Sequence, residues 1–532
     1  MSTATLLLQR QDRECRRLLA LSGGQGLAEA LRRSSPERLT DTRTAGYALS
    51  PVLISLYHPG SGLYQSPELR ALAESGLDYL ERERRESGCF DLNSCNFDTA
   101  PDTAFALNEL MDACRLMPPE DALTRRLLAL IGRAAEGICG GGFHTPNHRW
   151  VIAAALKQAA LLTGREDFSR RADVYLGEGL DINADGEFAE RSTGIYNAVN
   201  DEQMLRLYEI TGDRRYAEAA RANLLLMRYY LEPDGSLLTQ GSTRQDKGTR
   251  PAFSKYWIYY LMAGHFLDDS ELKGIAAGIR ERTPAESLSG LPWLLRHPGA
   301  EDGAAPLAPP ERYDRVFPAS GLGRWRRGGM SCTAFSGRPD FLYVMSGGMS
   351  LCVSLYGNVC DRRNFVPEAI RQTAEGCHLE AVAPSWYYLP FEGEGPDTRD
   401  WWAMDNPATR RRQIRDALRL SADIAVGEDS VTLKLAAEGL TGVPLRLELG
   451  FDPGLVEGEG FSLEGAPGAS LYVSQGTLRV TGEDGGLSVG PCFGSHRLQR
   501  RMGGAFPLSR ERMTVFLTDL SPMARELIIR AE

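Results

Sequence analysis

The sequence has few features of an exported, membrane-spanning or nucleic-acid-binding protein. Its N-terminal apolar run is only Leu6 to Leu8, and charges follow it without a small-residue cleavage site, so no secretory signal is predicted. No stretch approaches the roughly 18 apolar residues that a membrane-spanning helix needs. The formal charge is −10 and no Lys/Arg tract stands out, which argues against nucleic-acid binding. We therefore expect a cytoplasmic protein with neither a membrane nor a nucleic-acid partner.

The ten cysteines contain no CxxC pair, and their closest spacings are Cys89/Cys95 and Cys352/Cys360. Because no export signal is predicted, we expect reduced and mostly buried thiols. No His/Cys/Asp cluster has the spacing of a metal site. The neighbours Cys377-His378 and Cys360-Asp361 nevertheless leave a structural metal in the C-terminal half open.

The length and composition are those of an ordinary globular protein. A chain of 532 residues is long enough for two or three hydrophobic cores. Its 42% hydrophobic and 24% charged residues lie in the usual range, so the chain can bury those cores. The negative charge still permits a polyanionic ligand, because a cleft can be locally basic on an acidic protein.

A repeat of about fifty residues runs through the first half. Each unit has a helix, a Gly-rich turn, a polar loop and a second helix; the turns are SGCF, GGGF, DGEF and DGSL, ending at Phe90, Phe143, Phe188 and Leu237. The helices before the turns are amphipathic and those after them are more apolar. Residues 5–33 and 43–57 add another hairpin. This alternation predicts an incomplete (α/α) toroid over residues 1–297.

The second half has a different pattern. Residues 298–312 lie in a Pro-, Gly- and Ala-rich stretch and are the predicted linker. Residues 313–532 contain short β-rich runs such as VTLKLAAE and LRLELGFD between turn residues, which predicts an antiparallel β-sandwich. The expected fold class is thus α+β and multidomain. The long aromatic section 358–412, which includes Trp386, is expected to be functional.

Two loops, FHTPNHRW (143–150) and ERSTGIYNAVN (190–200), occupy the same place in consecutive repeats. Loops that lead into inner helices gather at one mouth of a toroid, so Asn147, His148 and Tyr196 are expected to meet. An amide, an imidazole and a phenol suit β-elimination from a uronic-acid sugar. That reaction needs a donor to the carboxylate, a base for the C5 proton and an acid for the leaving oxygen.

We assign roles on that basis. Asn147 would hold the carboxylate, and Tyr196 would be the acid and also a candidate base. His148 would be the base or a second donor, and the residues leave this choice open. Arg149 and Arg191 would lower the pKa of Tyr196 or bind acidic groups. No metal or organic cofactor is required.

Each of these residues also has a purely structural interpretation. Asn147 follows Pro146 and precedes a helix, so it could be an N-cap. His148 could be an ordinary helix-start histidine, and Tyr196 could pack between helices. Their occurrence together in matched loops is more specific than any one of them.

Other polar loop residues are candidates for substrate binding at the same mouth. Each could equally be a solvated charge or a helix cap. The candidates are Asn96, Asp98, Glu190, Gln240 and Arg244, with Lys247 beside them.

The chain resembles the heparinase II/III-like polysaccharide lyases and, more broadly, the α/α-toroid lyases. The resemblance rests on the Asn-His pair of TPNHRW, the Tyr of GIYN 49 residues later, and the toroid-then-sandwich layout. It implies an acidic oligosaccharide or polysaccharide substrate, carboxylate neutralisation by Asn147 or His148, and acid/base chemistry by Tyr196. It further implies a histidine from the β-domain, here His378 or secondarily His496, and a structural zinc in some members.

Two other functions remain open. A glycoside hydrolase on the same toroid would need two carboxylates, Asp98 or Asp102 with Glu187 or Glu190. A non-catalytic carbohydrate-binding protein would use the aromatic stretch from Trp386 to Trp402. The sequence leaves open the sugar, endo or exo action, and the oligomeric state, a homodimer included.

Overall fold

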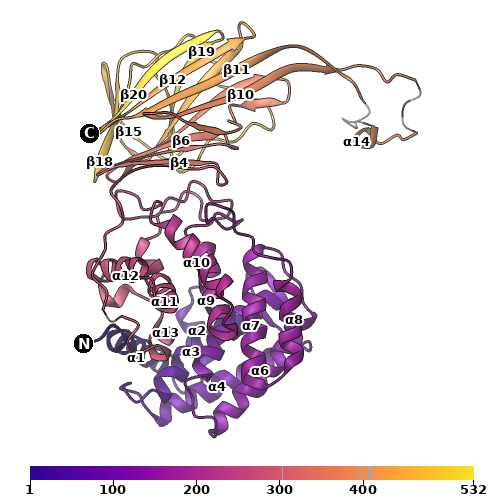
Figure 1. Ribbon diagram of the computed structural model, residues 1–532, viewed down its shortest axis with the longest axis vertical. Coiled ribbons are helices and arrows are strands. Elements are labelled where there is room, and N and C mark those ends of the chain that lie inside the picture. The colour runs from indigo at the N-terminus through magenta and orange to yellow at the C-terminus, as the bar shows by residue number, and fades with distance from the viewer. Residues whose placement is uncertain (302, 394, 396, 405–409) are drawn as a thin grey trace. The chain divides into compact units, whose positions relative to one another are not determined.

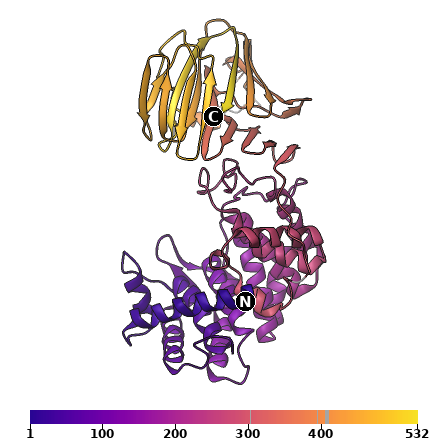
Figure 2. The same ribbon diagram turned by 90° about the vertical axis from the view of Figure 1, so that its left-hand side faces the viewer.

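The chain forms two compact units with different secondary structure. The structure, a computed structural model, describes residues 1–301, 303–393, 395, 397–404 and 410–532. The first unit is residues 1–231 with 237–309, and the second is residues 232–236 with 310–532. Helices make up most of the first unit and antiparallel sheets most of the second (Figures 1 and 2), which confirms the predicted fold class. The first unit also holds a hairpin of two short strands, β1 (Phe90–Leu92) and β2 (Asn96–Thr99). The division falls within the predicted linker, 298–312, but the short segment 232–236 was not predicted.

Five largely buried helices form the inner layer of the first unit, and each contacts the next in chain order. They are α3 (Thr42–Tyr57), α5 (Ala100–Cys114), α7 (Pro146–Thr163), α9 (Tyr196–Thr211) and α11 (Trp257–Leu267).

Each inner helix is followed by a more amphipathic one that packs on it. These outer helices are α4 (Pro67–Glu83), α6 (Ala122–Gly140), α8 (Glu166–Leu176), α10 (Arg214–Met227) and α12 (Ser270–Arg282). The remaining helices are α1 (Thr3–Ser22), α2 (Leu27–Ser34), η1 (Phe253–Tyr256), η2 (Ala285–Ser287) and α13 (Leu291–Arg296). Because α1 contacts both α3 and α13, the two ends of the helical series meet. No helix among the described residues is long and apolar enough to cross a membrane.

In two of the four Gly-rich turns the geometry excludes a side chain, and at Gly88 a Cβ would lie 2.2 Å from the backbone oxygen of Arg133. Gly186 has a φ of +90°, and a Cβ there would lie 2.4 Å from the backbone oxygen of Ala222. The turn then buries Phe188 and pairs it with Ile182. The GGGF turn differs, since Phe143 remains 37% exposed and only meets the Tyr175 ring edge-on. The sequence repeat is therefore not a strict structural repeat.

The second unit contains two sheets of nine strands. The first sheet has the order β15 (Phe461–Gly465), β14 (Gly454–Gly458), β17 (Leu478–Gly482), β18 (Gly485–Gly490), β20 (Met523–Ala531), β12 (Ser430–Gly439), β11 (Arg412–Val426), β10 (Gly376–Tyr388) and β9 (Ile370–Gln372). The second has the order β16 (Ser470–Tyr472), β19 (Met513–Leu520), β13 (Pro444–Phe451), β7 (Met349–Val359), β6 (Asp340–Ser346), β5 (Met330–Phe335), β4 (Leu322–Arg327) and β3 (Arg312–Phe317), with β8 (Arg362–Asn364) beside β7.

The core of this unit lies between its sheets. On β12, Val431, Leu433 and Leu435 alternate with more exposed residues and join one apolar cluster with Leu447 and Leu449 of β13. Such alternation is what a sheet with one buried face requires. The pairing is antiparallel throughout the named strands except between β16 and β19, which run parallel.

A short segment from the middle of the helical sequence belongs to the second unit. Within it, Glu232 forms a buried ion pair with Arg324 of β4, with Oε1 3.0 Å from Nη1. Ser331 donates a hydrogen bond to the other carboxylate oxygen, and Arg324 donates to Thr333 over 2.7 Å. The buried carboxylate and guanidinium thus compensate each other and have further hydrogen bonds to hydroxyl groups, as a buried pair needs.

Candidate functional site

The two predicted loops end at the first turns of neighbouring inner helices. Thr145 is the N-cap of α7, so Pro146 and Asn147 are its first two residues and His148 its third. Asn147 is therefore not the N-cap. Tyr196 is the first residue of α9, and its backbone N–H donates to the Ser192 hydroxyl over 3.1 Å. Since α7 and α9 pack together, these residues are carried on adjoining helix ends.

Asn147 is bound to Glu190 in a buried contact. Its backbone N–H and its side-chain Nδ2 both lie 2.9 Å from the Glu190 carboxylate, and Nδ2 also donates to Thr145 over 2.9 Å. The amide oxygen is buried and has no hydrogen-bond partner among the described residues. Burial raises the pKa of Glu190, although the bonds from Asn147 and the charge of Arg244 act against that rise. Two predicted residues are thus brought together by a direct contact.

Tyr196 lies beside the next loop of the chain. Its hydroxyl accepts a hydrogen bond from Gln245 Nε2 over 2.7 Å. The Arg244 guanidinium lies 4.9 Å from the centre of the Tyr196 ring, and its Nε is 3.5 Å from Glu190 Oε1. Arg244 therefore connects the phenol to the Glu190–Asn147 pair.

His148 is half-buried and close to charged groups. Burial lowers its pKa to about 4, assisted by His144, Arg244 and Arg43 and opposed by Asp102. Its ring meets Phe105 edge-on at 6.2 Å, and Nδ1 is buried without a hydrogen-bond partner among the described residues. The imidazole is consequently neutral near pH 7. A neutral imidazole can act as a base, whereas the alternative role of a charged donor to the carboxylate would require an imidazolium.

Asn96 and Asp102 form a third part of this region. Asn96 donates to Asp102 over 2.8 Å, and Arg43 of α3 forms an ion pair with the same carboxylate at 3.0 Å. Asp102 in turn acts electrostatically on His148. Asn96 is therefore placed near the predicted base through Asp102.

Two predicted residues, Arg149 and Asp98, have other partners. Arg149 is buried against the Trp150 ring and pairs with Glu178 and Asp181. Asp98 is exposed, accepts a hydrogen bond from Ser87, and has a φ of +50°.

Arg191 also has a positive φ, +51°, and its nearest carboxylate is Glu187 at 3.8 Å. Gln240 is buried in the loop that follows α10. Neither residue has a described contact with Asn147, His148 or Tyr196.

The predicted β-domain residues belong to the second unit. His378 Nδ1 lies 2.6 Å from Asp423 on the neighbouring strand, and Trp386 Nε1 donates to Asp361 over 3.0 Å. The secondary candidate, His496, contacts the backbone oxygens of Leu445 and Asp519. No group of three or more His, Cys, Asp or Glu side chains in the described part of the chain could hold a metal ion.

The sequence interpretation missed the residue that fixes these loops together. Asp246 is buried and accepts hydrogen bonds from Ser192, Ser242 and the backbone N–H of Gly194. It thereby ties the loop of Arg244 and Gln245 to the loop before Tyr196. Gln245 and Asp246 both stand in the quoted stretch TQGSTRQDKGTR, but nothing in that pattern separates them from other loop residues.

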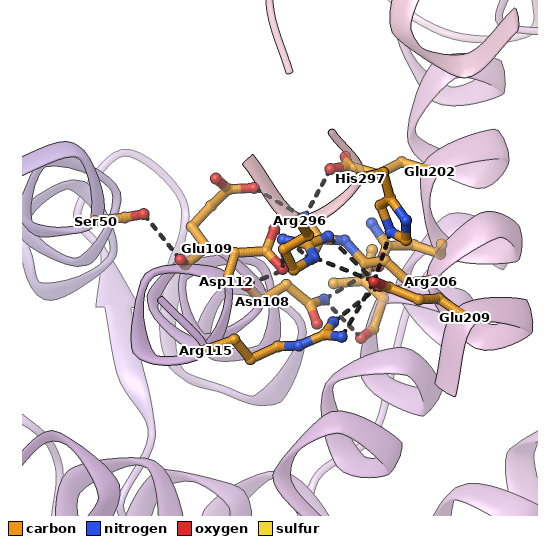
Figure 3. Close-up of polar contacts among 12 residues, drawn as sticks. Ser50, Asn108, Glu109, Asp112, Arg115, Glu202, Arg206, Glu209, Arg296 and His297 are labelled. Atoms are coloured by element: carbon orange, nitrogen blue, oxygen red, sulfur yellow. Dashed lines mark hydrogen bonds and ion pairs between the residues drawn. The ribbon is translucent and has the colours of Figure 1, made fainter. Parts of the chain in front are cut away.

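A second polar network lies between α5 and α9 (Figure 3). Arg206 contacts Asp112 at 2.6 Å, Glu202 at 2.8 Å and Glu109 at 3.4 Å. Arg206 and Asp112 are each only 1% exposed, whereas the two glutamates retain partial exposure. Burial and the Glu202 charge raise the pKa of Glu109. This network supplies paired carboxylates that the sequence interpretation did not identify.

The same network extends to α13. Arg296 contacts Asp112 at 3.0 Å, and Glu209 binds Arg115, Arg296 and His297 (Figure 3). Burial alone would raise the pKa of Glu209, but these donors hold it well below its usual range. The network therefore joins α5, α9 and α13 by buried charges.

Comparisons with known proteins identify the fold. No family model and no curated protein sequence matches the chain. Among solved structures, the heparan sulfate lyase of Pedobacter heparinus has a TM-score of 0.54 at 10% identity, over 95% of this chain and 77% of that one. The chondroitin AC lyase of Streptomyces coelicolor A3 has a TM-score of 0.53 at 14% identity, over 92% and 74%.

A Paenibacillus xanthan lyase matches 97% of this chain and 57% of its own, with a TM-score of 0.54 at 11% identity. At these identities the likeness concerns the fold alone. The chain has the helical toroid and β-sandwich of the heparinase-like polysaccharide lyases.

Proposed function

We propose that this chain is a polysaccharide lyase that cleaves uronic-acid-containing glycans by β-elimination. The observation that carries the proposal is the position of Tyr196: its hydroxyl meets Gln245 and its ring lies by Arg244, which also contacts the Glu190–Asn147 pair. A phenol beside a guanidinium and an amide offers the acid and the carboxylate donors that elimination requires. The fold of known lyases is consistent with this proposal.

In the proposed reaction, Arg244 binds the uronate carboxylate and stabilises the enolate that develops there. Both amide hydrogens of Asn147 are occupied in this structure, one by Thr145 and one by Glu190. Asn147 becomes a second donor to the substrate when Nδ2 gives up its hydrogen bond to Thr145. Glu190 holds that amide in place. The carboxylate charge is thereby neutralised before the C5 proton leaves.

The base removes the C5 proton, the C5–H electron pair forms the C4–C5 double bond, and the C4–O4 bond breaks. The leaving oxygen takes a proton from the Tyr196 hydroxyl. Either Tyr196 or His148 serves as the base, and the low pKa of His148 keeps its imidazole unprotonated, and so available as a base, near pH 7. The products are a new chain end and a 4,5-unsaturated uronate.

The decisive experiment compares Tyr196→Phe with Tyr208→Phe. Tyr208 lies on the same helix, but its hydroxyl meets the backbone oxygen of Phe266. Hyaluronan, chondroitin, heparan sulfate, alginate and polygalacturonate are the substrates, and the ultraviolet absorbance of the unsaturated uronate is the readout. We expect Tyr196→Phe to abolish the absorbance rise and Tyr208→Phe to retain it. Equal activity of the two variants, or no absorbance with any polyuronate, would contradict the proposal.

A glycoside hydrolase is the second candidate, favoured by one observation. Glu109 and Glu202 both contact Arg206, and the raised pKa of Glu109 provides a protonated carboxyl beside a charged one. Asp98, Asp102, Glu187 and Glu190, named from the sequence, are instead engaged with other side chains. New reducing ends without ultraviolet absorbance, lost in Glu109→Gln, would favour hydrolysis.

A further inference from the structure

Two strands of the second unit extend beyond their sheet. β10 and β11 pair with each other as far as Tyr388 and Arg412. β12 covers β11 only from Leu418, and β9 covers β10 only up to Leu379. The last residues of this pair therefore form a two-stranded ribbon that projects from the sheet toward α14 (Trp401–Met404) in Figure 1. Such a ribbon needs a reason other than sheet formation, because two strands alone are marginally stable.

The end of the ribbon and the residues just beyond it carry aromatic rings and guanidinium groups that stack on one another. The Arg412 guanidinium lies 4.1 Å from the Trp386 ring centre and 5.4 Å from that of Tyr388. The Arg410 guanidinium lies 5.3 Å from Tyr388 and 4.0 Å from Phe391. Trp401 adds a further ring 5.3 Å from Arg410. We call these six residues the aromatic–arginine ladder.

Trp401 and Arg412 of the ladder are exposed, the other four residues are partly buried, and the Asp361 carboxylate accepts a hydrogen bond from Trp386 beside them. Within the described residues, no carboxylate forms an ion pair with Arg410 or Arg412, whereas Arg411 between them pairs with Glu392. Beside the ladder, Tyr387 is 61% and Trp402 is 82% exposed. Large apolar side chains gathered on a surface usually mark a binding site.

Stacking prepares a guanidinium to bind an anion. Rings that cover its faces fix its plane and leave the N–H edge for a carboxylate or sulfate, which accepts two parallel hydrogen bonds. The neighbouring rings offer flat surfaces on which the C–H face of a pyranose can pack. Together these groups fit the alternating apolar and anionic surface of an acidic polysaccharide.

We propose that the aromatic–arginine ladder is a binding site for an acidic glycan chain, separate from the residues that carry out the reaction. The proposal rests on the proposed function only for the choice of ligand. It assigns to the C-terminal unit the capture of polymeric substrate through carboxylate or sulfate groups.

The test measures binding of the full chain to polygalacturonate and to heparin by affinity electrophoresis, with dextran as the neutral reference. The double variant Arg410→Gln/Arg412→Gln is compared with Arg415→Gln, which removes an exposed arginine of the same strand that takes no part in the ladder. We expect the double variant to lose about tenfold or more in affinity for the acidic polymers. Arg415→Gln should change it little, and dextran should be unaffected.

Equal losses in the double variant and in Arg415→Gln would overturn the proposal, because they would indicate non-specific charge attraction. Unchanged glycan binding would overturn it as well, including the case in which the double variant instead dissociates an oligomer in sedimentation. Turnover of a short uronate oligosaccharide is followed separately. If the unaltered protein does not turn over this oligosaccharide, the proposed lyase activity is refuted. The binding measurements with the polymers would still test whether the aromatic–arginine ladder binds acidic glycans.

Discussion

Replacement of Arg206 by methionine removes the one cation that Asp112, Glu109 and Glu202 share (Figure 3). Removing one partner of a buried ion pair costs about 3–5 kcal/mol, since the remaining charge is left uncompensated. Asp112 keeps Arg296 at 3.0 Å, so the lower end applies to it. Each partly exposed glutamate adds roughly 0–1 kcal/mol. We expect Arg206→Met to lower the free energy of unfolding by about 3–5 kcal/mol.

Calorimetry of the helical unit's transition measures this loss. About 2 °C per kcal/mol is expected for a unit of this size, so the midpoint should fall by roughly 6–10 °C. Arg126→Met is the matched control, because Arg126 also binds two carboxylates, Asp78 and Glu81, but at the surface. It should cost less than about 1 kcal/mol.

A second substitution separates the effect of the lost charge from the effect of the changed side-chain volume. Adding Asp112→Asn to Arg206→Met removes the uncompensated carboxylate and should restore part of the stability. The reasoning fails if Arg206→Met is no more destabilising than Arg126→Met. It also fails if the added Asp112→Asn makes the loss larger, since the penalty would then come from packing.

Two further predictions concern the site. The folded-state pKa of His148, about 4, lies below its ordinary value of 6.5, so protons bind the unfolded chain more tightly and the free energy of unfolding should fall as the pH drops from 6.5 toward 4. His148→Gln should flatten that decline in denaturant titrations, and an unchanged slope would contradict the burial of this imidazole. Glu190→Gln should lower turnover at least about tenfold, since it sets an amide N–H against the donors of Asn147, a mismatch of roughly 1–3 kcal/mol. Turnover and the unfolding midpoint of this variant are measured together, and unaltered turnover would exclude Glu190 as the residue that positions Asn147.

Periodicity predicted the architecture well because it reflects burial directly. The apolar inner helices and alternating strands had to bury those faces, and the fold class follows. The matched loops likewise predicted that Asn147 and Tyr196 lie on adjoining helix ends. The predicted roles of these residues, the substrate and the cytoplasmic location remain predictions.

Contacts between loops that are distant in the sequence could not be predicted from the sequence. The pairing of Asn147 with Glu190 and the anchoring of two loops by Asp246 depend on tertiary placement, which a local pattern does not encode. The same holds for Arg149, whose neighbours in sequence suggested a cleft residue but whose side chain binds Asp181 and Glu178. Side-chain direction, rather than position along the helix, separates these cases.

Residues 232–236 belong to the second unit although the sequence on either side of them belongs to the first, and this constrains how the protein can be divided into fragments. A fragment beginning at residue 310 would retain the buried Arg324 but lose the Glu232 carboxylate that balances its charge. An isolated sandwich cut at the apparent linker would thus lack the buried carboxylate that pairs with Arg324, and a helical fragment ending there would carry residues 232–236 without the strand residues that they contact. Any recombinant dissection should supply residues 232–236 in trans or replace Arg324 with an apolar side chain.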